Sequence, residues 1–488
     1  MLSLMIAVCN GARAGSAVDA YERFRALKDR SIKSSADQPS TEKSPIKVKT
    51  GKAERPQVRE TVPVKKVDLP RQVASESAPV ESSLSPALAA SPAAPTFPAD
   101  DYLTGDWGGT RARAAEAGYE FEFGYKGEFG KVVKGGVEQK QSYVDNLDVK
   151  LAVDLEKAVG WSGWSFLIYG LGNSGANGGH TPSAHVGDRQ VTSNIEAPVD
   201  DFRIFELQVK KNWNEDRSSI IIGLYDLASE FYSTGSSGVF LNSSFGPGHE
   251  LAQTGVLGPS IFPYAAPAVR VAVTDGSGTY LQSAVLSAVA GNAETQKGNL
   301  VVWGPDQGSL VITEAGQTWP RGERLGKLAF GGWMYTKTVD HLSYTLTDPA
   351  ANTVAEQATN AGAYVLLDVP VTESFSVFTR YGVANPNVNE VATNLQAGAN
   401  WQGPFTARPK DQLGLGLTRV TASELFKEVE LGAGNELRND EMTWELTYRF
   451  ELGSGLAIQP DVQVVSGPSF SKTIEEATVT SLRFDVAF

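Results

Sequence analysis

Apolar and polar residues alternate in many separate stretches of this chain, and this alternation limits the possible folds more than any other feature. Side chains alternate across a β-strand, so each stretch predicts a strand with one apolar and one polar face. A sheet whose last strand lies at the chain end leaves an exposed edge unless the sheet closes. We therefore expect a closed barrel, with its apolar face toward lipid and its polar face toward a lumen. Residues 479–488 show the pattern, with Leu482, Phe484, Val486 and Phe488 set between Ser481, Arg483, Asp485 and Ala487.

The polar faces of the predicted strands carry many charges. A core strand of a soluble sandwich rarely has so many charges on its second face, whereas a strand between lipid and water should have them. The stretch 441–453 is an example, in which Met442, Trp444, Leu446, Tyr448 and Phe450 alternate with Thr443, Glu445, Thr447, Arg449 and Glu451.

Sixteen stretches fit this description, and an even number is what bacterial single-chain barrels require. The sequence therefore predicts an all-β, transmembrane, antiparallel barrel of about sixteen strands with a disordered N-terminal extension. The predicted strands are 119–133, 139–158, 164–175, 203–213, 218–231, 263–275, 280–291, 308–320, 323–338, 361–373, 374–385, 394–404, 411–423, 441–453, 456–467 and 479–488.

The connections between these stretches alternate in length. Short turns on one rim and long loops on the other are typical of outer-membrane barrels. If both termini lie in the periplasm, the short turns are periplasmic. The long connections are 176–202, 232–262, 292–307, 339–360 and 424–440.

Composition excludes several other classes of protein. No stretch approaches the roughly 20 apolar residues of a membrane-spanning helix. The net charge of −13 argues against nucleic acid as a partner. The only cysteine, Cys9, lies near the N-terminus, so we expect no disulfide in the mature chain.

The first hundred residues differ from the rest of the chain. Residues 1–14 resemble a signal-peptide remnant, and residues 15–33 fit a short helical segment. Residues 34–98 are rich in Ser, Pro, Ala and Lys, which predicts a disordered linker, because such a segment cannot bury enough surface to fold. The linker is either a spacer or a tether that contacts the cell wall. The barrel domain is expected over 101–488.

Five short motifs carry a family resemblance over residues 101–488. Together they resemble the carbohydrate-selective porins of the OprB-like family. The resemblance implies a sixteen-stranded outer-membrane barrel that passes sugars. The motifs are LTGDWGGTR at 103–111, NIEAP at 194–198, FLNSSFG at 240–246, GPFTARPKDQLGLG at 403–416 and QPDVQ at 459–463.

Neither a nucleophile elbow nor a Walker A pattern occurs, so we expect no enzyme activity, no catalytic residues and no cofactor. His180 and His185 share a predicted loop without a third metal ligand. We therefore expect both histidines to be solvated and expect no metal site.

The position of a residue in the alternation of its strand, which we call strand parity, gives the candidate lumen residues. By strand parity, Glu206 faces the lumen and Phe205 faces lipid. The long connection 232–262 should fold into the barrel and narrow it, because irregular backbone at membrane depth must line water. Either these side chains contact solute, or their charges pair with one another and only stiffen the wall. The candidates are Glu206, Arg270, Phe378, Arg380, Glu445 and Arg449 on the wall, and His249 and Glu250 on the loop.

A sugar pore needs polar groups of both signs, because hydroxyl-rich solutes must replace lost water hydrogen bonds. We expect passive diffusion of mono- or disaccharides through the outer membrane of a Gram-negative bacterium, in contact with lipid and lipopolysaccharide. The alternatives are a general or ion-selective porin, and a structural barrel that tethers the envelope. The sequence leaves the oligomeric state open between monomer and homotrimer.

Overall fold

The computed structural model describes residues 102–176, 180–343 and 356–488. The predicted signal-peptide remnant (1–14), helical segment (15–33) and linker (34–98) lie outside the described residues.

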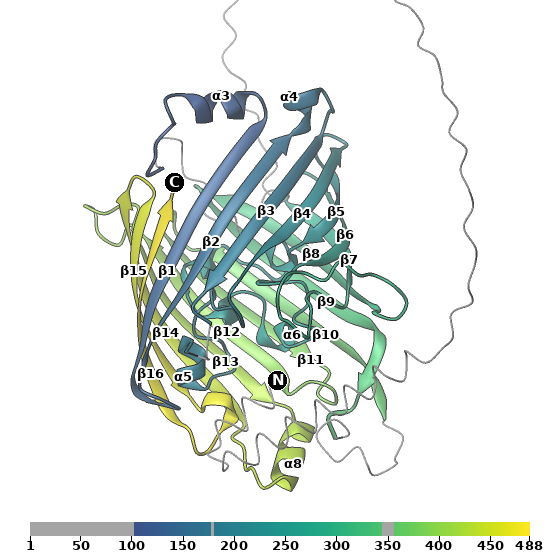
Figure 1. The fold of residues 1–488 in the computed structure, drawn as a ribbon, viewed down its shortest axis with the longest axis vertical. Helices are drawn as coiled ribbons and strands as arrows, with labels where there is room; N and C mark the ends of the chain where they lie inside the picture. The colour runs from purple at the N-terminus through teal and green to yellow at the C-terminus, as the bar shows by residue number, and fades with distance from the viewer. Residues whose placement is uncertain (1–101, 177–179, 344–355) are drawn as a thin grey trace, which may run out of the picture. The chain divides into compact units, whose positions relative to one another are not determined.

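Sixteen antiparallel strands form one closed barrel (Figure 1). Each strand pairs with its neighbours in sequence, and the first strand pairs with the last, which confirms the predicted barrel. The strands are β1 (Tyr119–Gly136), β2 (Gln141–Asp154), β3 (Trp164–Ser174), β4 (Asp201–Trp213), β5 (Ser218–Tyr225), β6 (Ala266–Thr274), β7 (Thr279–Ser287), β8 (Ser309–Arg321), β9 (Arg324–Asp340), β10 (Gln357–Pro370), β11 (Phe375–Ala384), β12 (Val391–Gln402), β13 (Gln412–Ala422), β14 (Asp440–Gly453), β15 (Leu456–Ser466) and β16 (Glu475–Ala487).

The barrel closes between β1 and β16. Their register runs from Gly124 opposite Ala487 to Gly136 opposite Glu475. Closure leaves no strand with an unpaired edge, which is the property that the alternating terminal strand predicted.

The two faces of the strands differ as predicted. On β16, Leu482 is 46% exposed on the outer surface, whereas its neighbour Arg483 is 5% exposed in the interior. On β14, Trp444 and Leu446 are exposed outside while Glu445 is buried inside. The outer face is therefore apolar at mid-strand, as contact with lipid requires.

The connections at one rim have nine residues or fewer, whereas five of those at the other rim are much longer. Five of the short turns are 214–217, 275–278, 322–323, 371–374 and 454–455, and β1 begins and β16 ends at that same rim. We call it the short-turn rim. The long connections 175–200, 226–265, 288–308, 341–356 and 423–439 leave from the opposite rim.

Short helices occupy the connections. Asp154 begins α4 by accepting hydrogen bonds from the main-chain N–H groups of Glu156 and Lys157, and Gly160 ends the helix with φ 79°. No helix among the described residues is long and apolar enough to cross a membrane. The helices are α3 (Thr110–Glu116), α4 (Leu155–Val159), α5 (Pro182–Val186), α6 (His249–Ala252) and α8 (Glu424–Gly432), with 3-10 turns η3 (Leu227–Ser229), η4 (Ser236–Val239), η5 (Ser243–Phe245) and η7 (Pro468–Phe470).

A β-bulge on β4 changes the facing of one predicted residue. Tyr169 of β3 pairs with Glu206, and the next residue, Gly170, pairs with Ile204, so Phe205 is left without a partner on β3. Phe205 and Glu206 are consequently both buried in the interior. The prediction that Phe205 faces lipid is wrong, because a bulge inserts one residue and shifts the alternation.

Candidate functional site

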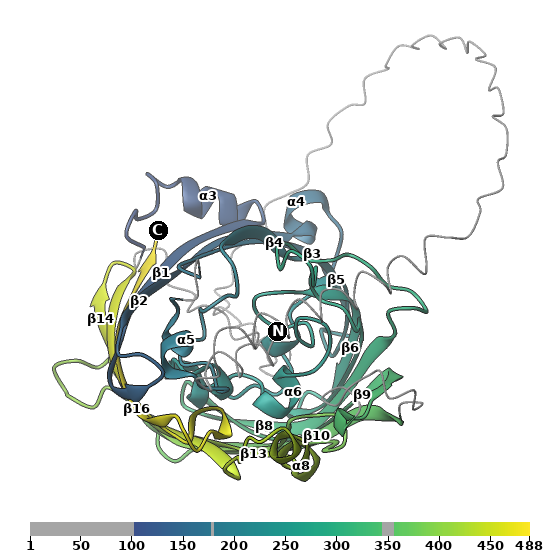
Figure 2. The same ribbon diagram turned by 60° about the horizontal axis from the view of Figure 1, so that its bottom comes forward.

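Two long connections fold into the barrel. Residues 226–265 form the long inward loop, which confirms the predicted inward course of 232–262. Residues 180–200 form the short inward loop, which the sequence did not predict to turn inward. Figure 2 shows α5 of the short loop and α6 of the long loop within the ring of strands.

Wall carboxylates hold the long inward loop by its main chain. Glu445 on β14 accepts hydrogen bonds from the N–H groups of Leu241 (2.6 Å) and Asn242 (3.0 Å). Asp368 on β10 likewise accepts from the N–H of Ser236 at 2.9 Å. These acceptors satisfy amides that the irregular loop leaves unpaired, so burial of the loop costs little in lost hydrogen bonds.

Two arginines hold the same loop from other strands. Arg270 on β6 donates from Nε and Nη2 to the carboxylate of Glu230, at 2.6 and 2.5 Å. Arg380 on β11 donates to the main-chain carbonyls of Tyr232 (3.1 Å) and Phe245 (2.5 Å). Both guanidinium groups are fully buried, and Arg270 also donates to Ser219 Oγ of β5 at 2.5 Å.

The short inward loop is held in the same manner. Glu441 on β14 accepts from the N–H groups of Arg189 (2.9 Å) and Gln190 (2.8 Å). The side chain of Gln463 on β15 donates to the carbonyl of Thr192 at 2.9 Å.

The two inward loops also bond to each other. The N–H of Asn194 donates to the carbonyl of Leu241 at 2.7 Å. The N–H of Ser243 donates to the carbonyl of Val191 at 2.9 Å. Asn242 adds a side-chain bond to the carbonyl of Gln190 at 2.6 Å. The loops therefore form one connected unit across the interior.

Three further predicted residues belong to the long loop or pack against it. Phe378 is buried under Phe240 and Phe245 of the long loop. The main chain of His249 donates to Asn394 at 2.9 Å. Glu250 is fully buried, and burial raises the pKa of its carboxyl to about 7.

One predicted histidine environment is wrong. His185 is buried at the end of α5, where its backbone carbonyl accepts hydrogen bonds from the N–H groups of Val137 and Glu138. His180, by contrast, is exposed. The error arose because the inward course of the short loop has no local sequence signal.

A second group of charged residues lies on the wall formed by β1, β2, β14 and β16. Lys126 pairs with Asp148 at 2.5 Å, Lys150 pairs with Glu122 at 3.3 Å, and Arg449 pairs with Asp485. We call these six residues the charge ladder. They line one small cavity and contribute three charges of each sign.

The ladder is more accessible than the loop anchors. The side chains of Glu122 and Lys126 are 32% and 26% exposed, whereas Arg270 and Arg380 are buried under the loop. Strand parity did predict Arg449 as a lumen residue. Glu206 lies on β4 and accepts hydrogen bonds from Gln208 (3.1 Å) and from the N–H of Asp226 (3.3 Å).

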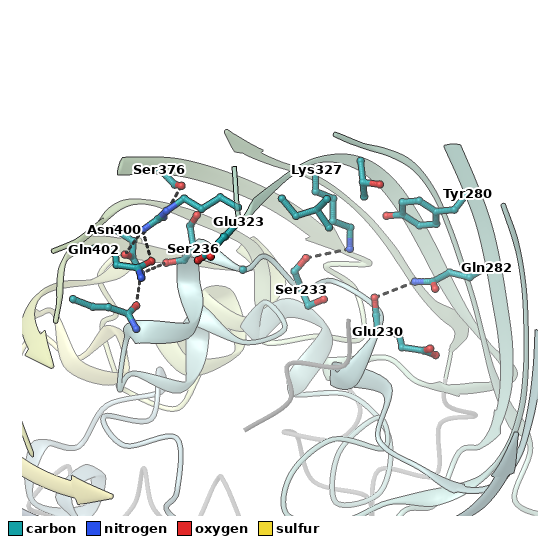
Figure 3. Close-up of a pocket in the computed structure, with 15 residues that line it drawn as sticks. Glu230, Ser233, Ser236, Tyr280, Gln282, Glu323, Lys327, Ser376, Asn400 and Gln402 are labelled. Carbon is teal, nitrogen blue, oxygen red and sulfur yellow. Dashed lines mark hydrogen bonds between the residues drawn. The ribbon is translucent and has the colours of Figure 1, made fainter. Parts of the chain in front are cut away.

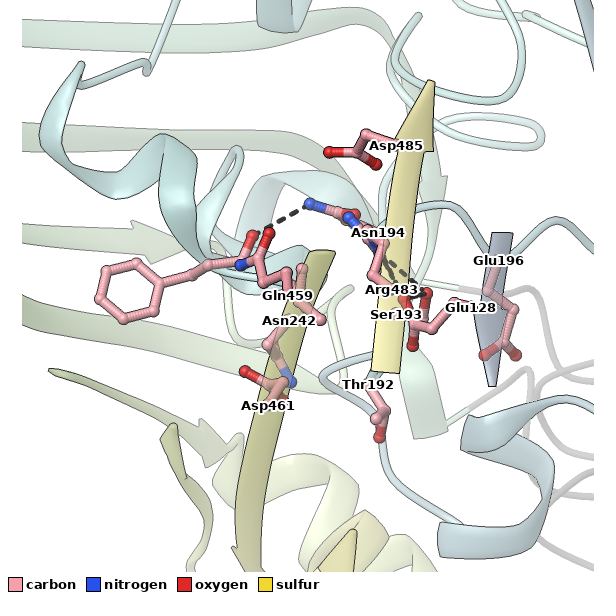
Figure 4. Close-up of polar contacts among 12 residues, drawn as sticks. Glu128, Thr192, Ser193, Asn194, Glu196, Asn242, Gln459, Asp461, Arg483 and Asp485 are labelled. Atoms are coloured by element: carbon pink, nitrogen blue, oxygen red, sulfur yellow. Dashed lines mark hydrogen bonds and ion pairs between the residues drawn. The ribbon is translucent and has the colours of Figure 1, made fainter. Parts of the chain in front are cut away.

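Sequence reasoning missed several residues that position the loops. A polar contact joins β1, β16 and the short loop, where Arg483 donates to Glu128 at 2.6 Å and Ser193 donates to the same carboxylate at 3.0 Å (Figure 4). Glu441 was also missed. Parity places both glutamates in the interior, but nothing local identifies the loop amides or side chains that they meet.

Known proteins resemble this chain in sequence. A porin called Porin B from Pseudomonas aeruginosa is 24% identical over 428 residues, which cover 80% of this chain and 92% of that protein. A putative porin, QuiX, from Acinetobacter baylyi is 26% identical over 124 residues, covering 22% of this chain and 28% of that one.

A solved structure has the same fold. The high-pH structure of Pseudomonas putida OprB superposes with a TM-score of 0.71 at 22% identity, covering 80% of this chain and 99% of that one. The model of the carbohydrate-selective porin family, OprB, matches residues 138–488. The chain therefore belongs to the OprB family of carbohydrate-selective porins.

Proposed function

We propose that this porin is a passive outer-membrane channel through which mono- or disaccharides diffuse along the charge ladder. The ladder is the observation that carries the proposal. Its charges are balanced, and the side chains of Glu122, Lys126 and Lys150 keep 18–32% of their surface exposed, so it offers donors and acceptors without a net field. A neutral, hydroxyl-rich solute can exchange water hydrogen bonds for these groups at little cost.

The inward loops supply the narrowing that selectivity needs. Their main-chain groups are largely satisfied by wall residues such as Glu441 and Glu445, so they form a fixed obstruction. A solute must then pass between this obstruction and the uncovered wall. The periplasm would lie on the side of the short-turn rim, since outer-membrane barrels place short turns there.

Liposome swelling tests this function. Vesicles that contain the protein should swell in isotonic glucose and maltose, and faster than in a charged solute of similar size. Reversal potentials in a salt gradient separate the alternative, a general ion-selective porin. Strong ion selectivity together with equal swelling rates in sugars and charged solutes would favour that alternative.

A further inference from the structure

A polar pocket lies on the side of the long inward loop that faces the short-turn rim, away from the charge ladder. Its volume is about 370 Å³, within the roughly 300–1,000 Å³ range of small-molecule sites. Figure 3 shows wall side chains from one half of the barrel facing loop residues such as Ser233 and Ser236. The pocket shares no lining residue with the ladder cavity.

The wall residues of the pocket lie close to one rim. Arg324 is the first residue of β9, directly after the turn 322–323. Gln402 ends β12, and Gln412 begins β13. All three positions belong to the short-turn rim, so the pocket lies between that rim and the long loop.

Arg324 is the central donor of the pocket. In the described part of the chain it forms no ion pair and bonds instead to neutral groups: Ser376 Oγ at 2.7 Å and the carbonyl of Glu373 at 3.0 Å. Its bonds to Asn400 and Gln402 are long, at 3.4 and 3.5 Å. Such weak bonds are easily exchanged for a ligand hydroxyl.

Glu323 also lines the pocket and forms no ion pair in the described residues, so it opposes the charge of Arg324, and the other charged lining residues are paired. Lys327 pairs with Glu314 at 3.0 Å, and Glu230 pairs with Arg270 at 2.5 Å. Amide and hydroxyl side chains make up most of the remaining lining, and each can both donate and accept. A sugar hydroxyl also does both, whereas a carboxylate or sulfate anion can only accept.

We propose that this pocket is a second sugar-binding subsite, which holds a neutral sugar ring between the constriction and the short-turn rim. The proposal rests on the proposed function and adds a defined binding position for the solute. Arg324 would donate to ring hydroxyls, and the amides of Asn400, Gln402 and Gln412 would complete the contacts. The long loop forms the roof, so a sugar there cannot leave directly toward the opposite rim.

Thiol protection tests the subsite without relying on transport. In a Cys9→Ser background, Ser233→Cys places a reporter of similar size in the pocket roof, and Ser277→Cys places a matched reporter on the exposed turn 275–278 of the same rim. A methanethiosulfonate reagent modifies each thiol. Maltose at about ten times its dissociation constant should slow modification of Ser233→Cys about tenfold and leave Ser277→Cys unchanged.

A second pair of variants tests the role of Arg324. In the Ser233→Cys background, Arg324→Gln should raise the maltose concentration needed for protection about five- to tenfold, since one or two hydrogen bonds are lost. Arg217→Gln, which removes an exposed charge from the turn 214–217, should not change it.

The outcomes separate the subsite from the proposed function. Equal modification rates with and without maltose, in a protein that passes sugar in liposomes, would overturn the subsite alone. Protection without passage of any sugar would support the subsite and overturn the proposed function. Protection by inorganic phosphate instead of maltose would overturn the assignment to sugar.

Discussion

The guanidinium of Arg380 donates to the main-chain carbonyl of Phe245 over 2.5 Å and so joins strand β11 to the long inward loop. The same side chain also donates to the carbonyls of Tyr232 and Gly246. One residue of the wall therefore bonds to two separated parts of the loop. This arrangement explains how a loop with little regular structure keeps one path through the barrel.

The first prediction concerns this anchor. Arg380→Ala should free three buried loop carbonyls, at a cost of about 1–3 kcal/mol for each group left unsatisfied. Single-channel recordings should show higher mean conductance and more current noise, and proteases should cut within 226–265 more readily. Arg217→Ala, at an exposed turn, is the control. A quiet, protease-resistant Arg380→Ala channel would contradict the anchoring role.

The second prediction concerns the lipid-facing surface. Leu446 lies at the middle of β14 and is 51% exposed, so Leu446→Arg should cost about 2–4 kcal/mol in the free energy of unfolding. Gln412→Arg puts the same side chain into the polar pocket and should cost little. Unfolding in lipid vesicles measures both. Equal losses in the two variants would mean that the assigned faces are incorrect.

The first prediction depends on the inward loop and the second on the faces of the strands, and the sequence shows the strand faces more clearly than the loop. Alternation along each stretch identified all sixteen strands and their faces, since a side-chain period of two is a local property. The exception is Phe205, because a bulge shifts the alternation without a local signal. The position of the inward loops is harder to predict from the sequence. Their position depends on matches such as Glu441 with the amides of Arg189 and Gln190, which are about 250 residues distant in sequence.

Burial also limited what could be predicted for the candidate site. Parity correctly placed Arg270, Arg380 and Glu445 in the interior, but parity cannot distinguish a side chain under a loop from one open to the lumen. The structure places all three under the long loop. Whether they also influence solute passage stays a prediction, which current recordings on the variants can test.

The third prediction is a pH dependence of loop seating. Burial raises the pKa of Glu250 to about 7, above its value in an open loop, while the nearby Arg380 opposes this shift. A carboxyl with a raised pKa favours the seated loop at low pH, and this preference is lost as pH rises through about 7. Current noise should therefore increase from pH 5 to pH 8.

Glu250→Gln provides the comparison for this pH dependence. The amide is neutral at every pH, so the increase in noise near pH 7 should be much smaller in the variant. The curves of variant and parent should converge at low pH, where Glu250 is protonated. An unchanged pH curve in Glu250→Gln would assign the effect to another group.

The last prediction concerns the ion pair between Arg483 of β16 and Glu128 of β1, at the seam where the barrel closes (Figure 4). Glu128 is fully buried and also accepts from Ser193 of the short loop. Arg483→Leu would leave this carboxylate without its cation, which should cost about 3–5 kcal/mol in the free energy of unfolding.

Matched variants separate the loss of the partner from the loss of the arginine itself. Arg419→Leu breaks an exposed pair with Asp440 and should cost about 0–1 kcal/mol. The double variant Glu128→Leu with Arg483→Leu should recover most of the lost stability, because an apolar pair replaces a buried ion pair at little net cost. Urea unfolding in lipid vesicles, followed by tryptophan fluorescence, measures all three. If Arg483→Leu were no more costly than Arg419→Leu, then the main-chain pairing of β1 with β16 would close the barrel without help from this ion pair.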